Sequence, residues 1–435
     1  GVRPGLTLAP EMKAGRAVPP YEEGLREGLF CRLPSGEVVR GPVWPGLAAF
    51  PDFTDPKARA WWGEKLKGFL EMGVAGLWLD MNEPALFAAW GEPTLPASAR
   101  HALEGQGGDH RLAHNLYGLL MARASWEGFR KHAPERRPFL LTRSGHAGVQ
   151  RYAWAWTGDV ESTWEGLRTF VGSGSGGFSG NPSPELYLRW FQMAALTPFF
   201  RLHAARWTKR REPWRFGEEV LEGVRRAMAL RESLLPYLYT LAHRASREGK
   251  PLLRPLFLEG GPYTEEAFLL GEALLVAPVL EEGARAKEVP LPTGGWYPWG
   301  EDRALQGPTW ARLPAPLDRI PLLGRAGTVL PLLEEGGLAL HLYPGAEGAE
   351  GRLYWDEGEG EGPYRLDRFR LLPAEGGFRL LWQGKGELPW PWARVRLRLF
   401  GKRLLRAHVE GEAHAAEEGG VLLPPFREAL LEVEG

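Results

Sequence analysis

Two aspartates follow short apolar segments and could act together as a pair of carboxyl groups. Asp80 ends the segment at residues 74–80, and Asp159 ends the segment at residues 152–159. Two carboxyl groups about 5 to 5.5 Å apart can serve as nucleophile and acid/base of a retaining glycosidase. The pair therefore indicates glycosidic chemistry if the fold brings both residues to one pocket.

A guanidinium and two indoles lie between these aspartates in the sequence. A nucleophilic carboxylate must stay ionised, and Arg143 would favour that state. The acid must hold its proton near neutral pH, and Trp154 and Trp156 would favour the neutral form by desolvation. An aspartate after an apolar segment is also a common helix cap or turn residue. The residue types alone leave the catalytic and structural interpretations about equally supported.

Other chemistries fit the sequence less well. Asp80 and Glu83 could bind Mg²⁺, but no further carboxylate is clearly placed to complete a set of oxygen ligands. The ten histidines form no zinc-binding pattern. Residues 172–177, Gly-Ser-Gly-Ser-Gly-Gly, lack the lysine of a phosphate-binding loop. We therefore expect neither a metal nor a cofactor.

The elements that would position these residues alternate between helix and buried strand. Asp55 with Pro56 is typical of a helix start and Gly73 of a helix end. A second helix is predicted near residues 111–132, with one apolar face formed by Leu112, Leu116, Leu119 and Trp126.

Five short apolar segments are predicted as strands. Continuous apolar strands between helices indicate a parallel sheet, and polar residues at its carboxyl edge are where a (β/α)8 barrel keeps its chemistry. The count is five strands, not eight. The segments are residues 74–80, 138–143, 152–159, 169–172 and 199–203.

Beyond residue 250 the pattern changes to period-2 alternation between Gly/Pro turns. Residues 287–297, 338–343 and 394–399 show this alternation, which predicts antiparallel β-sandwiches. The fold class is therefore α/β plus all-β, a partial (β/α)8 barrel followed by antiparallel sandwich domains. A turn-rich break at residues 334–337 separates two sandwiches. The predicted domains are the barrel at 1–250, a proximal sandwich at 251–335 and a distal sandwich at 336–435.

Composition excludes several classes of protein. With 44% hydrophobic and 25% charged residues the chain is globular rather than disordered. A net charge of -1 argues against a nucleic-acid or anionic-membrane partner, and no apolar run approaches the roughly 18 residues that a membrane-spanning helix needs. Cys31 is the only cysteine, which fits a reducing, cytoplasmic location. Abundant proline and few amides fit a heat-adapted protein, and a GC-rich genome would give the same bias.

An ordered series of segments resembles glycoside hydrolase family 31 across nearly the whole chain. Residues 76–84, Gly-Leu-Trp-Leu-Asp-Met-Asn-Glu-Pro, resemble that family's nucleophile motif W-x-D-M-N-E, and residues 156–159, Trp-Thr-Gly-Asp, resemble its acid/base motif. The other matching segments are residues 43–46, 50–54, 141–144, 176–178, 198–203, 318–321 and 325–327.

The resemblance implies a role for each matching residue. Asp80 would be the nucleophile and Asp159 the acid/base, with Glu83 orienting its neighbours. Substrate-binding roles are implied for Arg143 and His203, which would hydrogen-bond the sugar, and for Trp78, Met81, Trp156 and Phe178, which would surround it.

The sequence departs from the family pattern in two places. Gly174 stands where the family motif G-[AS]-D-I-G-G-F has an aspartate, and glycine supplies no side-chain hydrogen bond, so the family's substrate preference is weakened here. Family members also carry a β-sandwich and the first barrel strands ahead of the point where Gly1 begins. We therefore expect residues 1 to about 250 to form an open, incomplete barrel.

The sequence predicts a retaining α-glycosidase, in the first place an α-glucosidase acting on terminal α-linked glucose of oligosaccharides. An α-xylosidase or transglucosidase of the same family stays open. So does an inactive carbohydrate-binding fragment, because an unclosed barrel leaves strand edges unpaired. The sequence also leaves open whether the chain forms a homo-oligomer.

Overall fold

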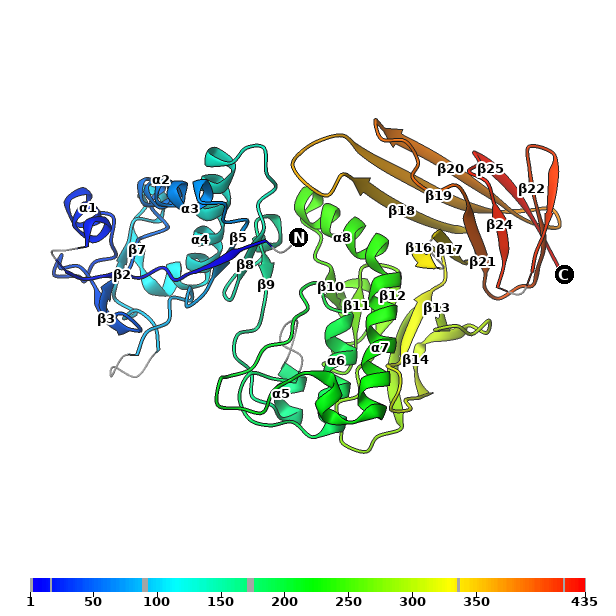
Figure 1. Ribbon diagram of the computed structural model, residues 1–435, viewed down its shortest axis with the longest axis horizontal. Coiled ribbons are helices and arrows are strands. Elements are labelled where there is room, and N and C mark those ends of the chain that lie inside the picture. Colours follow the sequence, from blue (N-terminus) through cyan, green and yellow to red (C-terminus); the bar gives the residue numbers. More distant parts are fainter. Residues whose placement is uncertain are drawn as a thin grey trace. The chain divides into compact units, whose positions relative to one another are not determined.

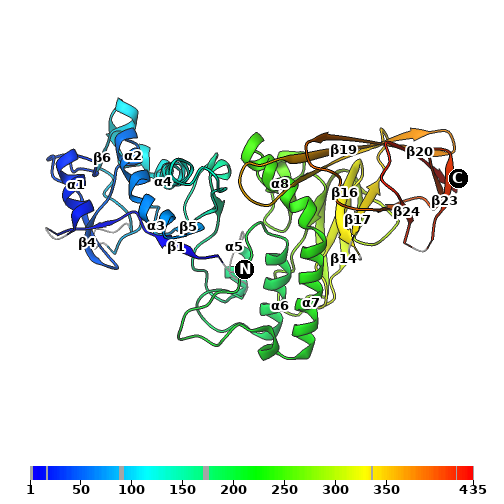
Figure 2. The ribbon, with the colours of Figure 1, turned by 45° about the horizontal axis from the view of Figure 1, so that its top comes forward.

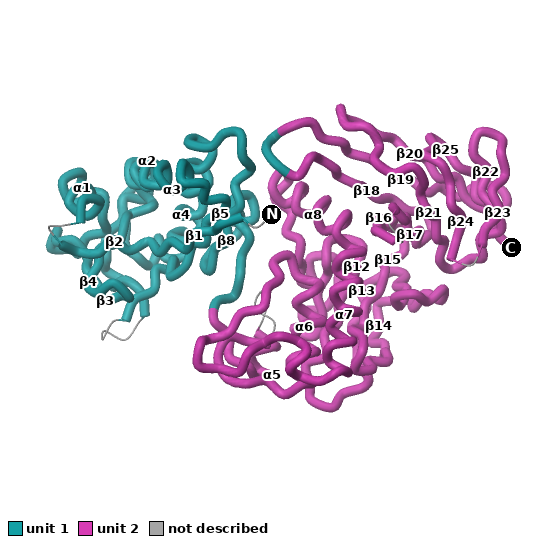
Figure 3. Tube along the Cα trace, in the orientation of Figure 1, with its two compact units in different colours: residues 1–158, 359–361 teal, residues 159–358, 362–435 magenta. Residues whose placement is uncertain are grey.

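The computed structural model describes residues 3–15, 18–87, 93–169, 176–334, 337–417 and 419–434. The chain divides into two compact units, coloured separately in Figure 3. Unit 1 comprises Gly1–Gly158 with Glu359–Glu361, and unit 2 comprises Asp159–Gly358 with Gly362–Gly435. The predicted domain boundaries near residues 250 and 335 stay a prediction.

Unit 1 is built on a parallel sheet of four strands in the order β1-β5-β8-β9 (Figure 1). Leu79 lies opposite both Leu8 and Thr142, so the carboxyl ends of the first three strands are level. Among the described residues the sheet is open, with β1 and β9 at its ends. The predicted strands at 74–80, 138–143 and 152–159 are confirmed as short strands. The bounds are β1 (Gly5–Leu8), β5 (Gly76–Leu79), β8 (Leu140–Thr142) and β9 (Trp154–Ala155).

Two strand predictions need correction or comment, and one strand of the sheet was not predicted. That strand is β1, in which alternate residues are exposed, so it has no continuous apolar run. The strand at 199–203 is wrong, since this segment is irregular apart from a bridge residue at Leu202. Just before it, the Arg231 guanidinium donates hydrogen bonds to the carbonyl oxygens of Ala195, Thr197 and Pro198. Thr169 ends a helix, and residues 170–172 lie outside the described residues.

The two predicted helices of unit 1 form, the first with its expected cap Asp55 and the second with Asp109, which the sequence analysis did not identify. Asp55 accepts a hydrogen bond from the backbone N–H of Lys57 at 2.8 Å, and Asp109 likewise accepts from Arg111. The first helix is divided at Leu66. The helices of unit 1 are α1 (Pro19–Glu27), α2 (Pro56–Lys65), α3 (Lys67–Glu71) and α4 (His110–His132), with the short turns η1 (Leu103–Gly105) and η2 (Val149–Arg151). Its short antiparallel strands are β2 (Met12–Lys13), β3 (Arg40–Val43), β4 (Gly46–Ala49), β6 (Arg100–His101) and β7 (Gly108–Asp109).

The predicted apolar face of α4 is only partly buried, since Trp126 packs against the core of unit 1 but two of its leucines are exposed. Leu112 is 66% exposed and Leu116 is 37% exposed, whereas the buried face is rich in small residues. A Cβ at Gly128 would lie 2.5 Å from the Cα of Gly63, so α2 and α4 meet backbone to backbone. Close helix approach selects small side chains at the contact, and a hydrophobicity pattern does not show it.

Unit 2 begins with helices that pack on one another. α6 and α7 lie side by side (Figures 1 and 2) around a core that includes Tyr187, Phe191 and Val224. A Cβ at Gly223 would lie 2.7 Å from Leu188, so this glycine permits the close contact. The helices are α5 (Trp164–Thr169), α6 (Pro184–Ala195), α7 (Glu218–Ser233) and α8 (Leu235–Glu248), with η3 (Pro213–Phe216) and η4 (Leu256–Glu259).

Two large sheets follow, in the region where period-2 alternation predicts β-structure. The six-stranded sheet has the order β10-β11-β12-β15-β13-β14, and the ten-stranded sheet has the order β23-β22-β25-β20-β19-β18-β16-β17-β21-β24. Pairing is antiparallel except for β16–β18 and β17–β21. The first sheet contains β10 (Leu253–Pro255), β11 (Phe268–Leu270), β12 (Leu274–Val276), β13 (Ala286–Pro298), β14 (Leu305–Pro314) and β15 (Leu322–Arg325). The second contains β16 (Thr328–Glu334), β17 (Gly337–Tyr343), β18 (Ala349–Asp356), β19 (Tyr364–Ala374), β20 (Gly377–Gly386), β21 (Val395–Leu399), β22 (Leu404–Val409), β23 (Glu412–Ala415), β24 (Val421–Leu423) and β25 (Glu428–Val433).

One buried arginine joins the helices of unit 2 to the segments around its first sheet. Arg189 of α6 is 1% exposed, and burial lowers the pKa of its guanidinium to about 10. Its N–H groups donate to backbone carbonyls that loops would otherwise leave unpaired. The acceptors are the carbonyl oxygens of Ala284, Ala315, Pro316 and Arg319. Satisfying buried carbonyls in this way fixes the loop against the helix.

Candidate active site

The carboxyl edge of the parallel sheet in unit 1 gathers most of the predicted site residues. Asp80 directly follows β5, and Arg143 directly follows β8. The backbone N–H of Asp80 donates to Leu8 O at 2.9 Å, and that of Arg143 donates to Leu79 O at 3.0 Å. Neighbouring parallel strands end at the same edge, so both side chains leave the sheet together.

The Asp80 carboxylate is held by two donors. Its Oδ1 lies 3.1 Å from Arg143 Nη1 and accepts the Met81 backbone N–H at 2.9 Å. Met81 reaches this position with φ +57°, in the left-handed region that a non-glycine residue enters at a cost of roughly 1–3 kcal/mol. The Asp80 side chain remains 30% exposed. It is thus fixed in orientation and open to a ligand.

Arg143 bridges three groups of this edge. Its Nε and Nη2 donate to the two carboxylate oxygens of Glu83 at 2.8 and 2.9 Å, and Nη2 also lies 3.1 Å from Met81 Sδ. Glycine suits position 158 for two reasons. A Cβ there would lie 3.2 Å from Arg143 Cδ, and the backbone has φ +81°, which other residues rarely adopt. Bidentate pairing fixes the plane of the guanidinium. Glu83 therefore orients Arg143, and Arg143 in turn orients Asp80.

Asn82 holds the turn that carries these residues. The side chain is 0% exposed, its Nδ2 donates to Thr142 Oγ1 at 2.8 Å, and its Oδ1 accepts the Ser144 N–H at 3.2 Å. A Cβ at Gly118 of α4 would lie 2.7 Å from the Ser144 carbonyl oxygen. The ends of β5 and β8 are therefore tied together and closed from one side by α4.

Two tryptophans from the predicted site pack against each other. The rings of Trp78 in β5 and Trp156 meet edge to face, with centroids 5.1 Å apart and an interplanar angle of 85°. The backbone N–H of Trp156 donates to Thr142 O at 3.1 Å, which places this residue beside the same strand end as Arg143. In unit 1 the structure thus brings together Trp78, Asp80, Met81, Arg143 and Trp156.

The other three predicted residues meet in unit 2. His203 Nε2 lies 3.8 Å from Asp159 Oδ1, and the Phe178 and His203 rings stack with centroids 4.8 Å apart. Burial and then the charge of Arg201 lower the pKa of His203 to about 4, so the imidazole is neutral near pH 7 and its contact with Asp159 is not an ion pair. The Asp159 side chain is 43% exposed. Gly174 lies outside the described residues.

The sequence motifs do not predict one residue of the unit 1 edge, Glu11. It follows β1 by three positions, and its carboxyl Oε2 is buried without a hydrogen-bond partner among the described residues. Burial raises the pKa of Glu11 to about 7, opposed by its own backbone N–H and reinforced by the charge of Asp80. Arg143 and Glu83 also act on this carboxyl. No motif could have identified Glu11, because only the pairing of β1 with β5 brings it near Asp80.

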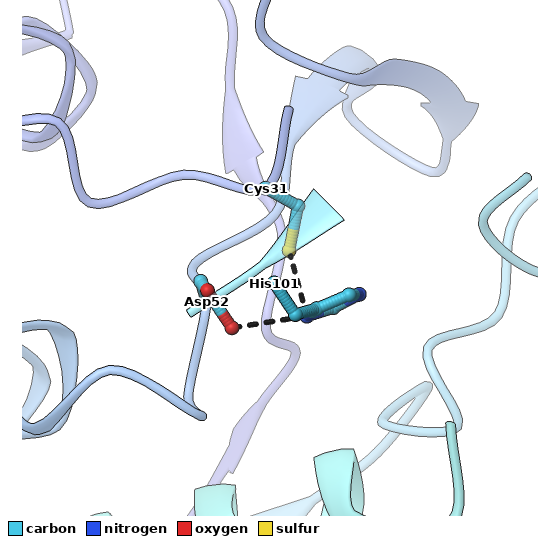
Figure 4. Close-up of side chains that lie close together, drawn as sticks. All are labelled: Cys31, Asp52 and His101. Atoms are coloured by element: carbon cyan, nitrogen blue, oxygen red, sulfur yellow. Dashed lines mark hydrogen bonds and ion pairs between the residues drawn. The ribbon is translucent and has the colours of Figure 1, made fainter. Parts of the chain in front are cut away.

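A second polar cluster of unit 1 has ligand types that could hold a metal. Cys31, Asp52 and His101 are buried with their donor atoms within 4.8 Å of one another, the one such group among the described residues (Figure 4). Asp52 already accepts from His101 Nδ1, Thr54 Oγ1 and the backbone N–H groups of Thr54 and Ala102. A metal would need the His101 Nδ1 lone pair, which the proton shared with Asp52 occupies. The cluster therefore fits a hydrogen-bonded core better than a metal centre.

The Mg²⁺ alternative at Asp80 and Glu83 also finds no support in the geometry, because a guanidinium already contacts both carboxylates.

Within the described part of the chain, no helix is long and apolar enough to cross a bilayer.

Comparison with known proteins agrees with this architecture. Residues 2–241 match the model of the glycosyl hydrolases family 31 TIM-barrel domain, and residues 249–330 match that of the family 31 C-terminal domain. The fold class predicted from the sequence, a (β/α) barrel domain followed by a β-rich region, is thereby confirmed.

Curated relatives carry α-glucosidase names. Alpha-glucosidase 2 of Bacillus thermoamyloliquefaciens is 36% identical over 388 residues, covering 82% of this chain and 49% of the relative. Lysosomal alpha-glucosidase of Bos taurus is 38% identical over 416 residues, covering 79% and 44%. The chain spans about half the length of the curated relatives that it matches.

Solved structures of the same family share the fold. A Flavobacterium johnsoniae GH31 dextranase complexed with glucose superposes with a TM-score of 0.80 at 25% identity, covering 99% of this chain and 62% of that one. A glucosidase II alpha subunit superposes with a TM-score of 0.78 at 28% identity, covering 99% and 52%. With a family model matching more than half of its length, the chain belongs to glycosyl hydrolase family 31.

Proposed function

We propose that this chain carries the catalytic residues of a retaining α-glucosidase that removes terminal α-linked glucose from oligosaccharides. The observation that carries the proposal is the contact of Asp80 with Arg143 at the carboxyl edge of the sheet, with Arg143 held in a bidentate pair by Glu83. A carboxylate that is oriented and 30% exposed suits attack on an anomeric carbon. The names of the curated relatives support glucose as the sugar.

The proposed reaction has two steps. Asp80 attacks the anomeric carbon and displaces the leaving-group oxygen, which takes a proton from Asp159, so that a glycosyl ester forms on Asp80. Water then attacks the same carbon and gives its proton to Asp159, and Asp80 is released as a carboxylate. Neutral His203 and the guanidinium of Arg143 would bind sugar hydroxyl groups, and Trp78 with Trp156 would supply an apolar surface.

Trapping the ester tests this proposal directly. The chain is incubated with a 2-deoxy-2-fluoro-type glucosyl inactivator, digested and mapped by mass spectrometry. We expect one added fluoroglucosyl group on the peptide that contains Asp80, and competing glucose should slow its formation. Labelling of another carboxylate, or turnover of an aryl α-glucoside without any labelling at Asp80, would contradict the proposal.

A further inference from the structure

Glu11 is fixed in the candidate site by the strands on either side of it. Before it, Leu8 O accepts the backbone N–H of Asp80 at 2.9 Å. After it, β2 pairs with β4 through Met12 opposite Ala49. The segment therefore runs past the carboxyl end of β5 with both flanks hydrogen-bonded, and Pro10 is buried in it. Glu11 is held where it is by the fold.

One oxygen of the Glu11 carboxyl group lacks the hydrogen-bond partner that a buried oxygen normally has. Its Oε2 is buried and accepts no hydrogen bond from the described residues. Leaving such an acceptor unsatisfied costs the desolvation of the group without a compensating hydrogen bond, so native proteins seldom do so without a functional reason. The neighbouring guanidinium of Arg143 contacts Asp80 and Glu83 instead. The free acceptor thus lies beside the group proposed to attack the sugar.

The charges around Glu11 indicate what kind of ligand group can donate a hydrogen bond to its unpaired oxygen. Asp80 and Glu83 oppose ionisation of Glu11, Arg143 favours it, and Tyr117 of α4 faces it as an uncharged group whose own pKa is raised far above its usual range by burial. A second anion would be repelled here. Glu11, Asp80 and Glu83 are also not among the described groups whose donor atoms lie close enough to share a metal ion. Neutral O–H donors fit this environment.

We propose that Glu11 is a further substrate-binding residue, whose carboxylate accepts hydrogen bonds from hydroxyl groups of the sugar bound at Asp80. The inference rests on the proposed glycosidase function and adds a specificity-determining contact to it. Hydrogen bonds from hydroxyl groups to an ionised carboxylate are short and about twice as strong as neutral ones. A sugar lacking the contacted hydroxyl would leave the buried carboxylate unpaired, which is how a polar site discriminates strongly.

Ionisation gives the contact a pH signature. Burial and the charge of Asp80 hold the pKa of Glu11 near 7, so the free carboxyl is partly protonated at neutral pH. Because hydroxyl donors favour the ionised form, sugar binding expels the proton and strengthens as pH rises through 7. Glutamine at this position cannot show that dependence.

The test crosses a variant with a substrate series. Glu11→Gln keeps the shape and removes the charge, and Glu37→Gln, at an exposed position, is the matched control. Each protein is assayed on an aryl α-glucoside and on its 2-, 3-, 4- and 6-deoxy analogues from pH 5.5 to 8.5. For the parent glucoside we expect Glu11→Gln to raise KM about tenfold or more, with a smaller change in kcat, and to flatten the rise of 1/KM with pH around 7.

The deoxy series separates a contact from a structural role. Glu11→Gln should lose the discrimination against one or two particular deoxy analogues and keep it against the others. Its thermal midpoint should equal or exceed that of the wild type, because an unpaired buried charge has been removed. An equal loss on all analogues, or a variant identical to Glu37→Gln, would overturn the inference while leaving the glycosidase proposal intact. A wild type that does not turn over or bind any member of the series would instead refute the glycosidase proposal.

Discussion

The two aspartates expected to share the chemistry have different surroundings. Asp80, in unit 1, accepts the Met81 N–H, pairs with Arg143 at 3.1 Å and is 30% exposed. Asp159, in unit 2, is 43% exposed and lies 3.8 Å from an imidazole that is neutral near pH 7. The contact described for Asp80 is with a guanidinium, and the contact described for Asp159 is with a neutral imidazole.

The contacts of Asp80 and the exposure of Asp159 match what the two proposed roles require. A nucleophile has to be ionised and aimed before the substrate arrives, which a guanidinium and a backbone N–H achieve. An acid/base has to exchange its proton with solvent and substrate in every turnover, and the 43% exposure of the Asp159 side chain permits that exchange. The comparison can be tested, because the surroundings of each aspartate predict a different loss of activity when that aspartate is replaced.

The largest effect is expected at Asp80. Asp80→Asn keeps the size of the side chain and removes the nucleophilic oxygen, so kcat on an aryl α-glucoside should fall by about 10³-fold or more. Asp55→Asn, at the cap of α2, is the matched control and should leave kcat unchanged, since asparagine caps helices as well as aspartate does. Retention of more than a tenth of the wild-type rate by Asp80→Asn, with a native circular-dichroism spectrum, would exclude Asp80 as nucleophile.

Asp159 should respond according to the leaving group. Asp159→Asn is expected to lower kcat/KM by about 10²- to 10⁴-fold on an alkyl α-glucoside, whose departing oxygen needs a proton. On α-glucosyl fluoride, which needs little protonation, the loss in the glycosylation step should be much smaller. The ratio of the two losses, measured by pre-steady-state kinetics, reports the role. Equal losses on both substrates would make Asp159 a structural residue.

Arg143 contacts both Asp80 and Glu83, so its replacement tests whether the guanidinium orients the proposed nucleophile. Arg143→Met would leave Asp80 and Glu83 facing each other without a cation, and we expect kcat to fall about 100-fold and the thermal midpoint to drop. Arg143→Lys keeps the charge but loses the bidentate geometry, so its loss should be intermediate. If both variants stay within about threefold of the wild type, the guanidinium does not orient Asp80.

The parts of the site that the sequence predicts are those encoded within one strand and its end. Asp80, Arg143 and Trp156 each follow or join a short apolar segment, and parallel pairing then brings them to one edge. Glu11 could not be found in this way, because β1 is a half-exposed end strand without an apolar run. Its proximity to Asp80 arises from a pairing between segments about 70 residues apart.

The two errors in the predicted secondary structure and packing have the same origin. The buried face of α4 was misassigned because its contact with α2 is made by Gly63 and Gly128, which carry no hydrophobic signal. The segment at 199–203 is apolar enough for a strand, but a guanidinium from α7 satisfies the carbonyls just before it. In both cases a long-range contact replaces the partner that a local pattern assumes.

A chain of histidines in unit 1 is another such long-range feature, and it predicts a smaller, pH-dependent effect. His101 Nδ1 donates to Asp52, which only accepts, so His101 Nε2 must accept from His110 Nδ1 at 3.0 Å. His110 Nε2 is then the acceptor for its neighbours Thr94 at 3.2 Å and His114 at 3.1 Å. Protonation of His110 would remove that acceptor and bury a charge.

The stability of the chain should therefore fall in mild acid through His110. Burial, then repulsion from His101 and His114 when these rings are protonated in acid, lower the pKa of His110 to about 4, opposed by Asp109. The unfolded chain, with a pKa of about 6.5, binds more protons than the folded one between those values. The contribution of neutral His110 to the free energy of unfolding is complete above about pH 6.5 and declines as pH falls toward 4, by at most about 1.4 kcal/mol per pH unit.

His110→Asn retains an N–H donor without titrating, so urea unfolding from pH 7 to 4.5 should show a smaller loss of stability for this variant than for the wild type. His408→Asn, at a partly exposed position, should lose stability as the wild type does. An unchanged slope in His110→Asn would mean that the buried chain of histidines already carries a proton at neutral pH, contrary to the tautomers assigned here.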